Sequence, residues 1–180
     1  ELDSQRLNLS TFQKRIGYIT QEPVIFTDTV FNNVTFWSEP TPENVTRFEK
    51  AISEAAISDY INTLPEGKET ELGNEGVNMS GGQKQRISIA RELYKEIDIL
   101  IMDEATSALD SETEQSIQEN IDNLKGNYTI ILVAHRLSTV KNADKIVLLD
   151  KGEISHFGAF HELKERSETF RRMVALQEFN

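Results

Sequence analysis

The chain has 180 residues, of which 38% are hydrophobic, and this is enough for a domain with a hydrophobic core. Its 30 acidic and 19 basic residues give a net charge of -11, which argues against a dedicated nucleic-acid surface, because such surfaces cluster Lys and Arg against phosphates. No cysteine is present, so disulfides, thiolate metal sites and cysteine nucleophiles are excluded, and a metal would need oxygen ligands.

No membrane span is expected. The longest apolar runs, such as residues 128–134, are far shorter than the roughly 20 residues that a span needs. We therefore expect this piece to be soluble. The first residue is Glu1 rather than Met, which favours a trimmed segment of a longer chain, and the alternative is a processed natural chain.

The first half of the chain shows one strand and then helices. Residues 15–20 carry a short apolar strand pattern, and the stretch after them is predicted as a loop because Pro23 restricts the residue before it. Residues 44–64 have apolar or small side chains at helical spacing, which predicts one or two helices ended by Pro65 and Gly67. Residues 69–78 are polar and contain glycine, so they are predicted to form a loop.

The second half alternates helices with apolar strands. Ser80 is a plausible N-cap for a helix over residues 82–95, and residues 97–102 form an apolar run typical of a strand buried on both faces of a parallel sheet. The later elements are a helix at 112–124, strands at 128–134 and 145–149, and a helical tail at 159–179. Strands that alternate with helices predict an α/β fold.

Two consecutive carboxylates follow the apolar run at residues 99–102. Asp103 and Glu104 would stand at the carboxyl end of a buried strand, where ligands bind in open α/β sheets. Aspartate there suits Mg²⁺, and the next carboxylate suits an attacking water. The alternative is that the two acids only cap the following segment, because apolar strands ending in acids are common.

A glycine-rich stretch begins the predicted helix at Ser80. Gly81 and Gly82 would let backbone N–H groups approach an anion closely, and the serine hydroxyl and the helix dipole add attraction. An isolated sequence of this kind is more often a helix start without a ligand. Gln83 and the basic residues just after it favour a phosphate site.

Two further polar residues follow predicted strands. His135 comes directly after the strand at 128–134 and would share a sheet edge with Asp103, so a contact to a terminal phosphate is preferred over a structural role. Gln21 follows the strand at 15–20, although a lone glutamine in a loop is weak support.

Taken together, these residues resemble the nucleotide-binding domain of the ATP-binding-cassette (ABC) transporters over nearly the whole chain. The motifs that match are the Q-loop at Gln21, the signature at Met79 to Gln83, Walker B at Ile99 to Asp103, the general base at Glu104, the D-loop at Ser107 to Asp110 and the switch histidine at His135. The resemblance implies ATP and Mg²⁺ as cofactors. It implies catalytic roles for Glu104, His135 and Gln21, metal contacts from Asp103 and Gln21, and nucleotide contacts from Ser80, Gly81, Gly82, Gln83 and Asp110.

The resemblance also predicts the architecture. It implies a parallel sheet of the P-loop NTPase kind, incomplete because the phosphate-loop strand is missing, with an inserted α-helical subdomain that carries the signature. The expected divisions are a core strand with the Q-loop at 1–26, the helical subdomain at 27–95, and the C-terminal core at 96–180.

The exporter subgroup is favoured by two segments. Residues 29–34 are similar to the exporter segment before the helical subdomain, and residues 69–76 resemble the coupling loop before the signature. Asn74 and Glu75 depart from the acidic and then basic residues expected there, so contacts to a membrane domain are expected to differ. Met79 replaces the usual leucine at similar volume.

The phosphate-binding loop G-x-x-x-x-G-K-[ST] is absent from these residues. None of the nine glycines is followed five residues later by Gly-Lys, so we expect this chain by itself to bind ATP weakly and to be inactive. The parent protein is expected to be an ABC exporter at the cytoplasmic face of the membrane. Its expected partners are a second nucleotide-binding domain and a transmembrane domain, and not nucleic acid. The alternatives are a non-catalytic module that supplies the signature in trans, and a soluble ABC ATPase.

Overall fold

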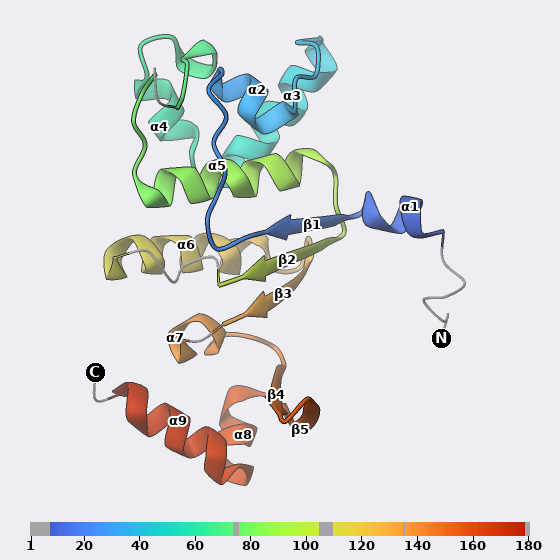
Figure 1. Cartoon of the computed structure of the whole chain (residues 1–180), viewed down its shortest axis with the longest axis vertical. Helices are drawn as coiled ribbons and strands as arrows, with labels where there is room; N and C mark the ends of the chain where they lie inside the picture. Colours follow the sequence, from blue (N-terminus) through green and yellow to red (C-terminus); the bar gives the residue numbers. More distant parts are fainter. Residues whose placement is uncertain (1–7, 74–75, 105–109, 135, 179–180) are drawn as a thin grey trace. The chain divides into compact units, whose positions relative to one another are not determined.

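The computed structural model describes residues 8–73, 76–104, 110–134 and 136–178. It divides into two compact units, Glu1–Val133 and Ala134–Asn180, which are drawn together in Figure 1 and are described separately below. Among the described residues, no helix has both the length and the apolar character needed to cross a membrane.

The first unit is organised by a parallel sheet of three strands in the order β1-β2-β3. These strands are β1 (Ile16–Ile19), β2 (Ile99–Asp103) and β3 (Thr129–Val133). Met102 pairs with Ile19 on one side and with Leu132 on the other, so the carboxyl ends of all three strands lie at one edge. The short helix α1 (Leu9–Gln13) precedes β1. The α/β class and the parallel sheet are therefore confirmed.

Only one face of this sheet is buried. Leu100 and Met102 of β2 are almost completely enclosed, whereas Tyr18, Ile131 and Val133 are 50%, 48% and 49% exposed. Because successive side chains of a strand point to opposite faces, the exposed residues share the second face. The prediction that the run at 97–102 is buried on both faces is wrong for this unit.

Helices cover the buried face and extend away from it. The two helices nearest the sheet are α5 (Gly81–Tyr94) and α6 (Ser111–Leu124), and both contribute to the cluster around Leu100, for example through Ile87 and Ile117. Beyond α5 lie the smaller elements α2 (Val30–Thr35), α3 (Pro42–Glu54), α4 (Ser58–Thr63) and η2 (Gly67–Glu69). Within this group, α2 and α3 pack on α5 (Figure 1).

Helix α2 is followed by two residues with left-handed backbone. Phe36 and Trp37 have φ angles of 52° and 58°, a conformation that is unfavourable for residues with a Cβ atom. The indole N–H of Trp37 donates to Asp28 at 2.7 Å, and its ring centroid lies 5.1 Å from that of Phe26. These contacts hold the turn in place.

The second unit is a hairpin packed on two helices. It contains α7 (Leu137–Val140), β4 (Ile146–Asp150), β5 (Glu153–Gly158), α8 (Phe160–Arg166) and α9 (Glu168–Glu178). Its core joins Ile146 to Leu163, Phe170 and Val174. The strand predicted at 145–149 is present, but β4 pairs in antiparallel fashion with β5, a strand that the sequence pattern did not indicate.

Candidate functional site at the carboxyl ends of the strands

The predicted residues of the nucleotide site gather first at the carboxyl edge of the parallel sheet. Asp103 is the last residue of β2, and Glu104 follows it directly. Gln21 is an exposed residue two positions after the end of β1. Because β1 and β2 are parallel neighbours, these three residues emerge at the same edge, as the sequence pattern predicted.

Asp103 is held by a tyrosine that sequence reasoning did not identify. The hydroxyl of Tyr18 donates to Asp103 Oδ2 at 3.0 Å. Tyr18 pairs with Ile101, and Asp103 lies two residues further along β2 on the same face, so a long side chain can bridge the diagonal. This hydrogen bond to the carboxylate raises the pKa of Tyr18, because deprotonation would remove the donor. Tyr18 could be identified only from the strand register, which a single sequence does not reveal.

Glu104 leaves the strand through an unusual backbone conformation. Its φ angle is 49°, in the left-handed region that costs about 1–2 kcal/mol for a residue with a Cβ atom. Its N–H still donates to the carbonyl of Val133 at 3.0 Å, which extends the ladder between β2 and β3 by one bond. Backbone strain of this kind concentrates at functional sites, which supports a functional role for Glu104.

The predicted helix start at Ser80 is present and forms a capping box. Ser80 Oγ accepts from the N–H of Gln83 at 3.3 Å, and Gln83 Oε1 accepts from the N–H of Ser80 at 2.8 Å. Both side chains therefore satisfy backbone donors at the start of α5. Gly81 is the first helical residue. The role of a helix start is confirmed, and anion binding by these residues stays a prediction.

Gly82 has a packing role that was not anticipated. A Cβ atom built on Gly82 would lie 2.3 Å from Cγ2 of Thr113, in the first turn of α6. Asp110 is the N-cap of α6 and accepts from the N–H of Thr113 at 3.0 Å, and this bond lowers the pKa of the Asp110 carboxyl. The amino ends of α5 and α6 thus meet, at the same end of the unit as the carboxyl ends of the strands (Figure 1).

A buried arginine ties α5 to the segment that follows Gln21. The Arg91 guanidinium donates to the carbonyls of Val24 at 2.8 Å and Asn33 at 2.6 Å, and it lies 5.0 Å from the ring centroid of Phe26. Arg91 is therefore a link between the helix that starts at Ser80 and the loop after β1. An arginine within the apolar stretch of α5 is the signal that could have identified it.

Some predicted residues lie outside the described residues. These are His135, the first three residues of the predicted D-loop at 107–109, and Asn74 and Glu75 of the loop before the signature. Among the residues that the structure does describe, no three His, Cys, Asp or Glu side chains cluster as metal ligands.

Comparisons with known proteins point to one group of membrane transporters. Residues 1–107 match the family model described as ABC transporter. The chain is 43% identical over 180 residues to an ATP-dependent lipid A-core flippase of Cupriavidus metallidurans, with 98% of this chain and 30% of that protein covered. It is 40% identical to the ABC-type transporter fsqE of Aspergillus fumigatus, with 98% of this chain and 14% of that protein covered.

The fold has a similar counterpart among solved structures. A bacterial Atm1-family ABC exporter with ATP bound superposes with a TM-score of 0.82 at 36% identity, over 97% of this chain and 30% of that chain. This chain therefore spans less than a third of the length of the relatives named here.

Proposed function

Because the chain belongs to the ABC transporter family, we propose that it is the larger, C-terminal part of the ATP-hydrolysing domain of an ABC exporter. The relatives named as a lipid A-core flippase and an Atm1-family exporter support the exporter type. Since the chain spans only part of these proteins, the export activity belongs to a longer protein. The carboxylate pair at the end of β2 is the observation that carries the proposal.

The proposed roles follow from the chemistry of each side chain. Asp103 and Gln21 supply oxygen ligands of the kind that Mg²⁺ prefers, and Mg²⁺ usually takes only one or two protein carboxylates together with phosphate oxygens. When bound, the metal neutralises charge that develops on the transferred phosphoryl group. Tyr18 keeps Asp103 oriented at 3.0 Å. Glu104 polarises the attacking water, and its strained backbone at the end of β2 supports a functional role there.

The remaining site residues complete the proposal. Ser80, Gly81, Gly82 and Gln83 present the start of α5 to a nucleotide phosphate held by a second nucleotide-binding domain. Asp110 contributes from the start of α6, and His135 contacts the terminal phosphate. The domain docks to a transmembrane domain at the cytoplasmic face of the membrane. Its proposed divisions are the core strand with the Q-loop at 1–26, the helical subdomain at 27–95 and the C-terminal core at 96–180.

The phosphate-binding loop is proposed to come from residues outside these 180. No stretch of this chain fits that loop, so the chain by itself binds ATP weakly and hydrolyses it negligibly. A catalytic test therefore needs the complete exporter.

The test is the Glu104→Gln substitution in the complete exporter. Glutamine keeps the size and hydrogen bonding of the side chain but removes the carboxylate, so ATP should still bind while turnover falls by about a hundredfold or more. ATP binding and steady-state hydrolysis are measured side by side. The matched control is Glu112→Gln, an exposed glutamate in the first turn of α6, which should leave turnover unchanged. If Glu104→Gln hydrolysed ATP at a near-normal rate, Glu104 would not be the general base.

A further inference from the structure

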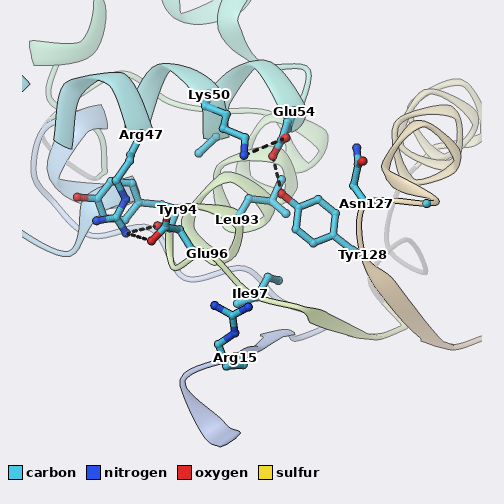
Figure 2. Close-up of a pocket in the computed structure, with 12 residues that line it drawn as sticks. Arg15, Arg47, Lys50, Glu54, Leu93, Tyr94, Glu96, Ile97, Asn127 and Tyr128 are labelled. Carbon is cyan, nitrogen blue, oxygen red and sulfur yellow. Dashed lines mark hydrogen bonds and ion pairs between the residues drawn. The ribbon is translucent and has the colours of Figure 1, made fainter. Parts of the chain in front are cut away.

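A pocket opens at the end of the parallel sheet opposite to Asp103. Its volume is about 590 Å³, and it lies between α3, the carboxyl-terminal end of α5 and the segments that lead into β2 and β3 (Figure 2). Ile97 and Tyr128, which precede β2 and β3, line it. Asp103 stands at the other end of β2, so this pocket is separate from the proposed nucleotide site.

The lining contains both cations and carboxylates. Arg15, Arg47 and Lys50 are its cations, and Glu54 and Glu96 are its carboxylates. Arg15 is already paired with both carboxylate oxygens of Asp98, so it adds no unpaired charge. Arg47 and Lys50 are therefore the cations that an anionic occupant would meet.

The carboxylates of the lining are already engaged, and one cation is only loosely held. Glu54 accepts from the hydroxyl of Tyr128 at 2.7 Å. Lys50 Nζ lies 3.9 Å from Glu54 Oε1, and its side chain is 70% exposed. This separation is longer than a hydrogen bond, so the ammonium group keeps donors for a ligand. Figure 2 shows Lys50, Glu54 and Tyr128 converging on one side of the pocket.

Arg47 forms the other cationic wall. Its guanidinium lies 4.6 Å from the ring centroid of Tyr94 and donates to the carbonyl of Tyr94 at 2.8 Å. A longer contact of 3.6 Å joins it to Glu96. Arg47 Nε is buried and has no hydrogen-bond partner within the protein. A ligand oxygen that draws Arg47 toward the pocket would give Nε the acceptor that it lacks here.

The rest of the lining is suited to an apolar body. The rings of Tyr94 and Tyr128 and the side chains of Leu93 and Ile97 face the same pocket. Aromatic and aliphatic walls with a few placed polar groups are typical of small-molecule sites. The volume and the lining together favour a compact molecule over a bare ion.

We propose that this pocket binds a small organic anion, with one carboxylate or phosphate group on a compact apolar body. Lys50 and Arg47 pair with the anionic group, and the rings of Tyr94 and Tyr128 pack against the body. The occupant touches α3 and the segment before β3 together, so its binding stabilises the folded first unit. This inference is independent of the proposed ATPase role.

The test is a titration of the 180-residue chain with phenyl phosphate and with benzoate, followed by calorimetry and by the midpoint of thermal unfolding. Both compounds should bind and raise the midpoint, whereas benzyl alcohol, which has the same ring without the charge, should do neither. Lys50→Gln and Lys50→Glu should each weaken binding by at least about tenfold, as expected for loss of a charged hydrogen bond. Lys50 is largely exposed, so neither substitution should unfold the chain.

The control is Lys151→Gln, which removes an exposed cation from the turn between β4 and β5. It should leave the affinity unchanged. The proposal is overturned if neither anion binds the unmodified chain, if Lys50→Glu binds as tightly as the unmodified chain, or if benzyl alcohol binds as tightly as benzoate. It is also overturned if Asp103→Asn, rather than the Lys50 variants, abolishes binding, because the anion would then occupy the nucleotide edge.

Discussion

At the scale of single residues, the space around Gly82 decides which side chain can stand there. The first turn of α6 approaches so closely that a Cβ atom at residue 82 would lie 2.3 Å from Cγ2 of Thr113. The backbone N–H of Thr113 also donates the hydrogen bond by which Asp110 caps α6. Any displacement that relieves the contact therefore disturbs the start of both helices.

Gly82→Ala should lower the free energy of unfolding by about 1–3 kcal/mol, the usual cost of overpacking a close contact. The higher helix propensity of alanine offsets less than about 1 kcal/mol of this loss. Thr113→Ser removes the methyl group that collides and keeps the hydroxyl, so the double variant should recover most of the stability. Urea denaturation measures the free energy of unfolding of each of these variants. A double variant no more stable than Gly82→Ala would exclude the Thr113 contact as the cause.

At the scale of elements, the start of α6 depends on a charged cap. Asp110 accepts from the N–H of Thr113 at 3.0 Å, and its pKa is lowered by this bond. A carboxyl group whose pKa is lower in the folded state contributes stability above its ordinary pKa, and this contribution is lost as the pH falls through the folded value. The cap is thus strongest at neutral pH.

Asp110→Ala should destabilise the chain at neutral pH, and the difference from the unmodified chain should shrink in acid. Asp110→Asn is the matched control, because its amide oxygen can cap the helix without titrating, so the stability difference between Asp110→Asn and Asp110→Ala should change little over the same acidic range. Urea unfolding at neutral pH and below the folded-state pKa provides the measurement. A constant difference between Asp110→Ala and the unmodified chain at both pH values would contradict the charged cap.

Sequence patterns predicted the elements whose signals are local. The capping residues at Ser80 and the turn at Pro65 to Gly67 bounded helices to within one or two residues of their observed ends. Helix α2 is only six residues long, and β5 carries polar and charged residues among its apolar ones. Neither therefore shows a clear hydrophobic period.

In the candidate site, too, only the residues with a local sequence signal could be predicted. Asp103 and Glu104 could be placed because the end of an apolar strand is visible in sequence. Tyr18, Thr113 and Arg91 could not, because their roles depend on strand register and on helix contacts between residues far apart in the chain. Such contacts leave no periodic signal in one sequence.

At the scale of the whole molecule, the parallel sheet has an uncovered face and an unpaired side. Tyr18, Ile131 and Val133 are about half exposed on that face. Among the described residues, β3 pairs only with β2, and β4 pairs only with β5. Exposed apolar surface and unpaired strand edges both promote association with other chains.

The 180-residue chain should therefore self-associate as its concentration rises, and Ile131→Lys combined with Val133→Lys should reduce this association without unfolding the chain. Lysine on an exposed strand repels neighbouring copies and weakens edge pairing. Sedimentation velocity over a concentration series gives the measurement. Leu132→Lys is the contrasting variant, since Leu132 packs against the core and its substitution should unfold the chain. A chain that stays monomeric at every concentration would contradict this expectation.

The strained turn after α2 also gives the molecule an intrinsic optical probe. Trp37 is the one tryptophan in the sequence, and its indole N–H is bonded to Asp28, beside the Phe26 ring on which Arg91 stacks. Its fluorescence should therefore respond when the loop after β1 shifts against α5. Since the bonds from Asn32 and Trp37 lower the pKa of Asp28, the emission should stay constant over the neutral range and change only in acid. A spectral change at neutral pH would then signal motion of this loop instead of a local titration.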